Sequence, residues 1–431
     1  MIMKIHFIGI GGIGVSALAK YYTETDHKIS GSDLVSSEIT DALKKSGVRI
    51  FIGKHKMQNL PKNTELVVYS PAVQKDNPEL KQAKKQGIKC QTYPQALGQL
   101  TKKYFTIAVS GTHGKSTTSS MIGLLLLKAG LDPTIIVGTK LKELGNSNCR
   151  VGKSKYLVIE ADEFKASFWS YWPQIIVLTN VEKEHMDFFK NLNHIFKVYA
   201  KYLKHLSGNG ILVANKDDEN VCKLSKVVKN TKYYSLNQKE SGKLGKLLKI
   251  PGKHNISNAL AVLSVARILG IPDKISFKSL EEYKGSWRRF DEKMVKIGKH
   301  NILVILDYGH HPTEIRVTLK AAREKYPRKK IWCVFQPHQY QRTYYLWNDF
   351  VKTFQNAPVD KLILTDIYDV AGREKKEIKK KIDSKKLIKA INKPEAIYLS
   401  KDKIADYLKD NLRGREVVII MGAGDIYRIF S

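Results

Sequence analysis

The sequence contains little cysteine and no long hydrophobic run. The four cysteines, which form no CxxC or Cys/His ligand spacing, are Cys90, Cys149, Cys222 and Cys333. The most apolar short stretch, Met121 to Leu127, is far shorter than the roughly 20 residues that a membrane span requires. From Met3 the chain runs directly into a strand-like segment, without the apolar region and cleavage site of a signal peptide. We therefore expect a soluble protein of the reduced cytoplasm, with no membrane partner.

Arginine is scarce in a chain that is otherwise strongly basic. Only 13 of the 74 basic residues are arginine, and the lysines are spread through every segment instead of forming one stripe. Because nucleic-acid interfaces favour arginine for bidentate contacts, the formal net charge of +33 indicates a solvated, lysine-rich surface and no nucleic-acid partner. An ATPase that binds nucleic acid remains an alternative on charge alone. The positive field would also attract anionic nucleotide substrates.

Short continuous runs of Val, Ile and Leu recur along the chain and are separated by helix-length amphipathic stretches. Such runs are typical of parallel strands that are buried on both faces, so the sequence predicts an α/β fold with helices on both sides of its sheets. The predicted strands are Lys4 to Ile10, Leu66 to Tyr69, Phe105 to Val109, Tyr156 to Ile159, Ile175 to Leu178, Ile211 to Val213, Ile302 to Leu306, Ile331 to Phe335, Leu362 to Leu364 and Val417 to Met421.

The length and the order of the predicted elements indicate more than one domain. A chain of 431 residues is too long for one ordinary domain. A strand, a glycine loop and a helix follow one another near Gly9 and again near Gly111, and each such unit is the natural start of a doubly wound sheet. A third set of strands begins after Arg289. We therefore predict three domains, at residues 1–103, 104–288 and 289–431.

The first glycine loop, GIGGIG from Gly9 to Gly14, follows a predicted strand and opens a predicted helix at Ile13. It satisfies the pattern GxGxxG, in which glycines let the backbone approach a diphosphate at the helix N-terminus. Asp33, in the segment Gly-Ser-Asp, lies where an acidic group would meet a ribose hydroxyl. The pattern fits a dinucleotide-dependent oxidoreductase, and a nucleotide-sugar diphosphate would use the same geometry.

The second glycine loop, SGTHGKS, connects a predicted strand with a helix that is predicted to begin around Thr117. Its backbone N–H groups would hold phosphate oxygens, Lys115 would neutralise the β- and γ-phosphates, and the Ser116 hydroxyl would ligate Mg²⁺. The generic pattern GxxxxGK[ST] has a glycine where this chain has Val109. The loop is therefore a variant P-loop with GxxGK[ST] spacing.

Acidic side chains follow two further predicted strands. The segment EADE begins at Glu160, after the strand Tyr156 to Ile159, and NVEKEHMD, which contains His185, follows Ile175 to Leu178. In an open α/β sheet the active site lies at the carboxyl ends of the strands. Glu160 and His185 are therefore candidates to share a cation that bridges phosphate and acceptor. A helix N-cap and a structural histidine are the alternatives.

Polar side chains also lie near the predicted boundary of the third domain. The segment PGKHNISN, with Asn255 and Asn258, precedes a helix predicted at Ala259 to Leu269. An asparagine there would cap the helix or read an adenine edge. Arg289 lies where an arginine would swing onto a γ-phosphate as the domains close.

Two histidine-containing segments follow strands of the third predicted domain. In DYGHHP, which starts at Asp307, one histidine is expected to hold the turn, while the other, or Asp307, faces the nucleotide. In QPHQYQR, His338 and Arg342 are four residues apart. Arg342 would grip a carboxylate or a developing acyl-phosphate charge.

The order of these motifs resembles that of the Mur ligases of cell-wall synthesis. The resemblance runs from Lys4 to the end of the chain and rests on HFIGIGGIGVSALA, SGSD, SGTHGKSTT, EADE, NVEKEHMD, PGKHNISNALA, RRFD, DYGHHPTEI, FQPHQYQRT and MGAGDI. Within the family, the pairing of DYGHHPTEI with FQPHQYQRT is similar to the members that add L-alanine. The murein tripeptide ligase of cell-wall recycling, which differs mainly in these C-terminal motifs, is the nearest alternative.

The resemblance implies three domains: an N-terminal Rossmann-like domain that holds UDP, a central P-loop ATPase-type parallel sheet and a C-terminal Rossmann-like domain. The implied reaction uses ATP and Mg²⁺ to join L-alanine to the carboxylate of UDP-N-acetylmuramate through an acyl phosphate. The first glycine loop would then hold a UDP diphosphate. A nicotinamide-dependent dehydrogenase, which leaves the P-loop unexplained, becomes a remote alternative. We expect a monomer or a weak homodimer.

Carried over position by position, the motifs imply several groups of site residues. The UDP-substrate group comprises Gly9, Gly11, Gly12, Ile13, Gly14, Ser32 and Asp33. The ATP group comprises Gly111, Thr112, His113, Gly114, Lys115, Ser116, Thr117, Asn255, Asn258, Arg289 and Asp307. The metal group comprises Ser116, Glu160 and His185. The catalytic group comprises Lys115, His185, Arg289, His338 and Arg342.

Three features depart from the family pattern. Ser116 stands where the family usually has threonine, which keeps the hydroxyl. Lys183 lies in the loop with the metal-ligand candidate, where a neutral or acidic residue is commoner, so we expect weaker metal affinity. The stretch Ile211 to Pro251 is shorter than usual, so we expect a short antiparallel element of the central domain to be missing.

Overall fold

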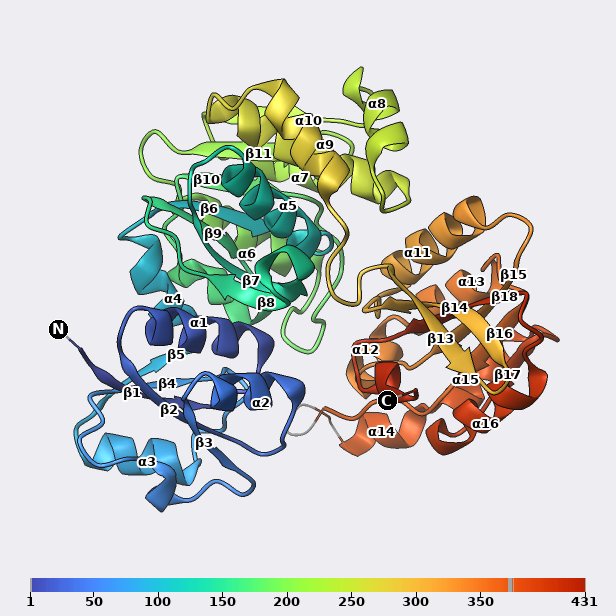
Figure 1. Ribbon diagram of the computed structural model, residues 1–431, viewed down its shortest axis with the longest axis horizontal. Helices are drawn as coiled ribbons and strands as arrows, with labels where there is room; N and C mark the ends of the chain where they lie inside the picture. Colours follow the sequence, from blue (N-terminus) through green and yellow to red (C-terminus); the bar gives the residue numbers. More distant parts are fainter. Residues whose placement is uncertain (1, 371–373, 375, 431) are drawn as a thin grey trace. The chain divides into compact units, whose positions relative to one another are not determined.

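The computed structural model describes residues 2–370, 374 and 376–430, and these residues form three β-sheets. Figure 1 shows the sheets in chain order, blue for the first, green for the second and orange to red for the third. Contacts divide the chain into two compact units. The first unit comprises the residues up to Val181, Ile195–Gln238 and Asn258–Tyr283, and the second comprises Glu182–His194, Lys239–Ser257 and the residues from Lys284 onward. The predicted α/β class is confirmed.

The first sheet has five parallel strands in the order β3-β2-β1-β4-β5. The predicted first strand ends at Ile8 and not at Ile10, because Gly9 turns the chain with a φ of 76°. Residues on both faces of the central strand are buried, as Phe7 and Ile8 show. The elements are β1 (Lys4–Ile8), α1 (Ile13–Glu24), β2 (Lys28–Asp33), α2 (Glu38–Lys45), β3 (Arg49–Ile52), η1 (Met57–Asn59), β4 (Leu66–Tyr69), α3 (Pro78–Lys85), β5 (Lys89–Thr92) and α4 (Tyr93–Thr101).

The central sheet has the order β12-β11-β10-β6-β9-β7-β8, and only β7 and β8 pair antiparallel among its described strands. Strands β10, β6 and β9 are neighbours and pair parallel, so their carboxyl ends lie at one edge of the sheet. The elements are β6 (Phe105–Ser110), α5 (Lys115–Lys128), β7 (Thr134–Leu141), η2 (Lys142–Leu144), β8 (Ser147–Arg150), β9 (Tyr156–Glu160), η3 (Phe164–Ser170), β10 (Ile175–Leu178), α6 (Leu192–Leu203), β11 (Ile211–Asn215), α7 (Glu219–Ser225), β12 (Thr231–Tyr234), α8 (Glu240–Leu247), α9 (Lys253–Ile268) and α10 (Asp273–Glu282).

Two helices of this region begin earlier than the sequence predicts. Helix α5 begins at Lys115, directly after the turn at Gly114. Helix α9 begins at Lys253, after Gly252 with its φ of 99°, so Asn255 and Asn258 lie inside the helix. The prediction that an asparagine caps this helix is therefore wrong. The structure describes the stretch from β11 to α8 completely. Its two strands, β11 and β12, pair parallel.

The third sheet has the order β13-β14-β18-β15-β16-β17, with β13 antiparallel at one edge and the other pairs parallel. In β18, Val417 and Ile419 join the core cluster of α11, α13 and α15, whereas Val418 and Ile420 join the cluster of α16 on the other face. The elements are β13 (Asp291–Ile297), β14 (His300–Asp307), α11 (Pro312–Lys325), β15 (Lys330–Phe335), α12 (Tyr340–Tyr345), α13 (Trp347–Gln355), β16 (Lys361–Leu364), α14 (Lys376–Lys381), α15 (Ser384–Ile391), β17 (Ala396–Tyr398), α16 (Lys401–Asn411), β18 (Glu416–Met421) and η4 (Ile426–Arg428).

Candidate active site

The P-loop between β6 and α5 takes its shape from two glycines. Gly111 has a φ of 129° and Gly114 a φ of 83°, which are backbone conformations that other residues rarely adopt. A Cβ on Gly111 would also lie 2.1 Å from Thr179 Oγ1, and one on Gly114 would lie 2.6 Å from Asn258 Oδ1. The loop therefore fits against its neighbours only because both positions lack a side chain.

The end of β10 holds the P-loop in place. The amide of Thr112 donates to the carbonyl of Asn180 at 2.9 Å, and the amide of His113 donates to Asn180 Oδ1 at 2.8 Å. Thr179 Oγ1 and Asn180 Nδ2 both donate to the carbonyl of His113, at 2.6 and 3.1 Å. Two amides of the loop are thus used within the protein. The first amides of α5, which have no carbonyl partner inside the helix, are left to bind an anion.

Lys115 is held by the loop and by a carboxylate. Its Nζ donates to two carbonyls of the loop at 2.5 and 3.1 Å, and to Glu163 Oε2 at 2.9 Å. Burial acts to lower the pKa of Lys115, but the carboxylates of Glu163, Asp162 and Glu160 outweigh it and raise this pKa. The ammonium group is therefore charged at neutral pH and directed by the loop.

Glu160, the last residue of β9, lies beside the start of α5. Ser116 Oγ donates to Glu160 Oε2 at 3.0 Å, and the amide of Gly138 donates to Oε1 at 2.5 Å. A Cβ on Gly138 would lie 2.9 Å from Glu160 Oε2, so glycine is needed for this approach. The structure thus brings the predicted metal candidates Ser116 and Glu160 together, at the carboxyl edge of the central sheet.

The two asparagines of α9 have different surroundings. Asn258 is buried, and its side chain lies close to Gly114 at the start of α5. Asn255 is also buried, and its Nδ2 donates to the carbonyl of Pro251 at 2.6 Å. Of the two, Asn258 is the one that the structure places beside the P-loop.

The first glycine loop is tied to the end of β2. The amides of Gly9 and Ile10 donate to the carbonyl of Ser32 at 2.8 and 3.0 Å. The amide of Gly11 donates to Asp33 Oδ2 at 2.8 Å. The sequence predicts that Asp33 meets a ribose hydroxyl. In the structure its carboxylate accepts a hydrogen bond from the glycine loop itself.

The hydroxyl of Ser32 is buried and belongs to a polar cluster around Glu79. Ser32 Oγ donates to Glu79 Oε2 at 2.6 Å, and His6 Nε2 lies 2.9 Å from the same oxygen. His55 Nδ1 and Asn59 Nδ2 each lie 2.8 Å from Glu79 Oε1. Burial acts to raise the pKa of Glu79, but hydrogen bonds from His55, His6, Ser32 and Asn59 lower it well below its usual range. The cluster stabilises the end of β2, and the substrate contact expected of Ser32 stays a prediction.

His185 lies in the loop between β10 and α6, which belongs to the second unit. It has a φ of 53°, and its carbonyl accepts from the amides of Phe188 and Phe189 at 2.8 Å. His311, the residue before α11, anchors this loop. Its Nδ1 accepts from the Thr313 amide at 3.2 Å, so the proton is on Nε2. Nε2 donates to the carbonyl of Lys183 at 3.1 Å. The side chain of Lys183 plays no part in this contact.

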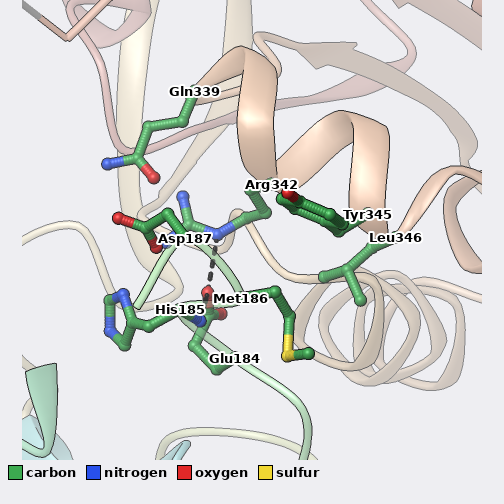
Figure 2. Close-up of a pocket in the computed structure, with 8 residues that line it drawn as sticks. All are labelled: Glu184, His185, Met186, Asp187, Gln339, Arg342, Tyr345 and Leu346. Atoms are coloured by element: carbon green, nitrogen blue, oxygen red, sulfur yellow. Dashed lines mark hydrogen bonds and ion pairs between the residues drawn. The ribbon is translucent and has the colours of Figure 1, made fainter. Parts of the chain in front are cut away.

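A pocket forms where this loop meets α12, and Figure 2 shows the guanidinium of Arg342 pointing toward Glu184. Arg342 Nε donates to Glu184 Oε1 at 2.9 Å, and Nη1 lies 3.1 Å from His338 Nδ1. Burial acts to raise the pKa of Glu184, but Arg342 and the neighbouring histidines hold it well below the usual range. The pocket is lined by Glu184, His185, Met186, Asp187, Gln339, Arg342, Tyr345 and Leu346.

Asp307 and Arg289 lie close to each other at the start of the third sheet. Asp307 Oδ2 accepts from the Phe290 amide at 2.9 Å and Oδ1 from the Gly309 amide at 2.8 Å. Burial raises the pKa of Asp307, while Arg289 acts to lower it. Arg289 Nη1 lies 3.5 Å from Glu314 Oε1 and stays partly exposed. Its neighbour Arg288 is buried and donates to the carbonyls of the turn after β18.

Family models for three Mur ligase domains match the chain in order. The Mur ligase catalytic domain matches residues 4–105, the Mur ligase middle domain matches 109–266, and the glutamate ligase domain matches 288–424. The chain belongs to the Mur ligase family. As in other Mur ligases, the α/β fold has three parts, each with its own sheet.

Among curated Mur ligases, the UDP-N-acetylmuramate–L-alanine ligase of Acetivibrio thermocellus is 43% identical over 99% of this chain and 94% of its own length. The enzyme of the same name from Clostridium acetobutylicum is 41% identical over 99% of this chain and 96% of its own length. The crystal structure of the UDP-N-acetylmuramate–alanine ligase of Thermotoga maritima superposes with a TM-score of 0.81 at 29% identity, covering 99% of this chain and 97% of that one.

A murein peptide ligase from Psychrobacter arcticus has a TM-score of 0.74 at 22% identity, covering 99% of this chain and 97% of that one, and shares the fold. None of the helices in the described part of this Mur ligase is long and apolar enough to cross a membrane.

The predicted site residues of this Mur ligase belong to both units. Lys115, Ser116, Glu160 and Asn258 lie around the P-loop in the first unit. His185 and Arg342 line the pocket of the second unit, and His338 lies beside Arg342. Asn180, which holds the P-loop, and Glu163, which pairs with Lys115, are not among the predicted site residues. They lie in the motifs NVEKEHMD and EADE, but no spacing rule marks them as partners of the P-loop.

Proposed function

We propose that this chain is an ATP-dependent ligase that joins L-alanine to the carboxylate of UDP-N-acetylmuramate through an acyl phosphate. The observation that carries the proposal is the P-loop, where Lys115, Ser116 and Glu160 lie together in a Mur ligase fold. The names of the curated relatives, at 43% and 41% identity over 99% of the chain, support these two substrates. We also propose domain boundaries near residues 103 and 288, and a monomer or weak homodimer that acts in the cytoplasm.

The first step brings two anions together, because a carboxylate oxygen attacks the γ-phosphorus of ATP and ADP leaves. Lys115 would offset this repulsion. In the structure Glu163 is its carboxylate partner, and a γ-phosphate would replace Glu163 there while the loop carbonyls keep the side chain directed. The amides at the start of α5 would donate to phosphate oxygens, and Asn258 would lie near the adenine. In the second step the amine of L-alanine attacks the acyl carbon and inorganic phosphate leaves.

The donor set at the P-loop fits Mg²⁺. Ser116 offers a hydroxyl and Glu160 a carboxylate, and both are hard oxygen ligands that lie 3.0 Å apart. Because Gly138 anchors Oε1 of Glu160, the carboxylate presents Oε2 in a fixed direction. Bound Mg²⁺ would offset phosphate charge. We propose His185 as a further ligand because of the resemblance of its motif to those of the Mur ligases. The contacts described here support the two oxygen ligands, Ser116 and Glu160.

The other proposed contacts divide between the two Rossmann-like parts. The first glycine loop would receive the diphosphate of UDP on the amides of Ile13 and Gly14, because the Gly11 amide is already bonded to Asp33. In the C-terminal part, Arg289 would approach the γ-phosphate and Asp307 the ATP ribose. His338 and Arg342 would bind near the acyl phosphate or the incoming L-alanine.

The proposal is tested by measuring ADP and phosphate release with purified protein. Release should require ATP, Mg²⁺, UDP-N-acetylmuramate and L-alanine together. Lys115→Ala should lower the rate by at least about 100-fold, because the main cation at the γ-phosphate is lost. Lys128→Ala removes a lysine at the other end of α5, where Lys128 pairs with exposed Glu282, and should keep full activity.

The amine that the enzyme uses separates this function from its nearest alternative. If UDP-N-acetylmuramate supports release only with a tripeptide as the amine, and never with L-alanine, the chain is a murein tripeptide ligase and the proposal is wrong. Stoichiometric binding of NADH at the first glycine loop would instead favour a dehydrogenase.

A further inference from the structure

Helix α4 places one tyrosine against the first glycine loop. A Cβ on Gly14 would lie 2.9 Å from Cζ and 3.0 Å from the hydroxyl oxygen of Tyr93. The phenol end of the ring therefore packs against the third glycine of the loop. A side chain at position 14 would require the ring of Tyr93 to shift.

The position of Tyr93 is fixed by both ends of its helix. At the N-terminus, Thr92 and Gln95 form a capping box in which each side chain accepts from the backbone amide of the other. Further along, a Cβ on Gly98 would lie 2.3 Å from the carbonyl oxygen of Ser170 in η3. Helix α4 therefore packs against the first glycine loop through Tyr93, and through Gly98 against η3, the segment that follows β9.

The hydroxyl of Tyr93 makes no hydrogen bond with any residue that the structure describes. Burial raises the pKa of Tyr93, and the carboxylates of Glu160 and Asp162 raise it further. The phenol is therefore protonated at neutral pH. A protonated phenol offers a hydrogen to an anion, whereas Glu160 and Asp162 nearby would only repel one.

We infer that the Tyr93 hydroxyl binds the carboxylate-bearing sugar of the UDP-linked substrate, an inference that rests on the function proposed above. The diphosphate at the start of α1 and the carboxylate that accepts the phosphoryl group belong to one molecule. Tyr93 packs against the loop proposed for the diphosphate, and it is near enough to Glu160 and Asp162 for their charges to act on its phenol. It is the donor that holds the sugar half of the substrate while its carboxylate approaches the metal-binding edge, so it is a substrate-positioning residue.

The test compares Tyr93→Phe with the wild-type chain by titration calorimetry. UDP-N-acetylmuramate should bind about 10- to 100-fold more weakly to the variant, as expected for losing one hydrogen bond to a charged group. UDP should bind equally to both proteins, and its affinity also shows that the glycine loop is intact. In turnover, the KM for the UDP-linked substrate should rise while the KM for ATP stays the same. UDP-N-acetylglucosamine, which lacks the carboxylate, should lose much less affinity than UDP-N-acetylmuramate.

The matched control is Tyr233→Phe in β12. Tyr233 is 46% exposed and its hydroxyl pairs with Ser225 at 2.7 Å, so this variant should bind every ligand as the wild type does. Unchanged affinity of Tyr93→Phe for UDP-N-acetylmuramate would overturn the inference alone. An equal loss for UDP would also overturn it, because the hydroxyl would then contact the nucleotide. A wild-type chain that binds no UDP-N-acetylmuramate would overturn the proposed function as well.

Discussion

His310 is a histidine that the fold keeps uncharged. Burial, and next Arg342, lower its pKa from 6.5 to about 3, while Glu314 and Glu184 act in the opposite direction. Above pH 6.5 both the folded and the unfolded chain leave His310 neutral, so its contribution to stability is fully present. Between pH 6.5 and 3 only the unfolded chain takes up the proton, so the free energy of unfolding falls by up to about 1.4 kcal/mol per pH unit.

His310→Asn should therefore make the melting temperature less sensitive to acid. We expect the decrease between pH 7 and pH 5 to be smaller in the variant than in the wild type, when both are followed by circular dichroism. His300→Asn, at the partly exposed first residue of β14, is the matched control and should keep the wild-type slope. An identical slope in His310→Asn and wild type would show that His310 takes up its proton in the folded chain too.

At the scale of residues, the sequence predicted the side chains that local patterns mark. Lys115 and Ser116 follow a glycine loop, and Glu160 follows a buried strand, and the structure brings these three together. Asn180 and Tyr93 carry no such pattern, because each acts on a loop that is distant in sequence. Their partners become visible only when the order of strands is known, which local spacing does not give.

At the scale of elements, continuous apolar runs marked many of the buried strands. Leu66–Tyr69 and Ile175–Leu178 match their predicted bounds, because both faces of these strands are covered. Strand β7, which reads TIIVGTKL, was missed although it is apolar. Other missed strands are polar: β2 reads KISGSD and β8 reads SNCR. Such segments form strands because a neighbouring strand pairs with their backbone, and the side chains carry little signal of that pairing.

The hairpin of β7 and β8 contacts both the start of α1 and Glu160 at the end of β9. Asn148 in β8 is buried, and its Nδ2 donates to the carbonyl of Ile13 at 2.6 Å and to Ser16 Oγ at 3.0 Å. In β7, the amide of Gly138 holds Glu160. Asn148→Ala should lower the free energy of unfolding by about 1–3 kcal/mol, since it leaves buried polar atoms of α1 without their donor.

Urea denaturation measures this loss, and turnover shows its effect on the site. Because Asn148 supports the start of α1, we expect the KM for UDP-N-acetylmuramate to rise more than the KM for ATP. Asn230→Ala, whose side chain is exposed before β12, should change neither quantity. A variant Asn148→Ala with wild-type stability would mean that water replaces the side chain at no cost.

At the scale of the whole molecule, the predicted fold class is confirmed. The exact domain boundaries remain predictions. Contacts alone group the first two sheets into one unit, and they assign the loop Glu182–His194 to the unit of the third sheet. The sequence could not show this, because the loop follows β10 directly along the chain. His311 and Arg342 determine its place, through bonds to residues far away in sequence.

The net charge of +33 is a property of the whole chain, and it should act on the substrates unequally. ATP and UDP-N-acetylmuramate are anions that a positive field attracts, whereas L-alanine is a zwitterion with no net charge. Raising KCl from 0.1 to 1 M shortens the screening length from about 10 to about 3 Å. We expect kcat/KM for UDP-N-acetylmuramate to fall roughly tenfold, while the KM for L-alanine stays within about twofold and serves as the internal control. If both parameters change equally, salt acts on the fold or on domain closure. If neither changes, the lysines are too evenly spread to steer an anion toward the site.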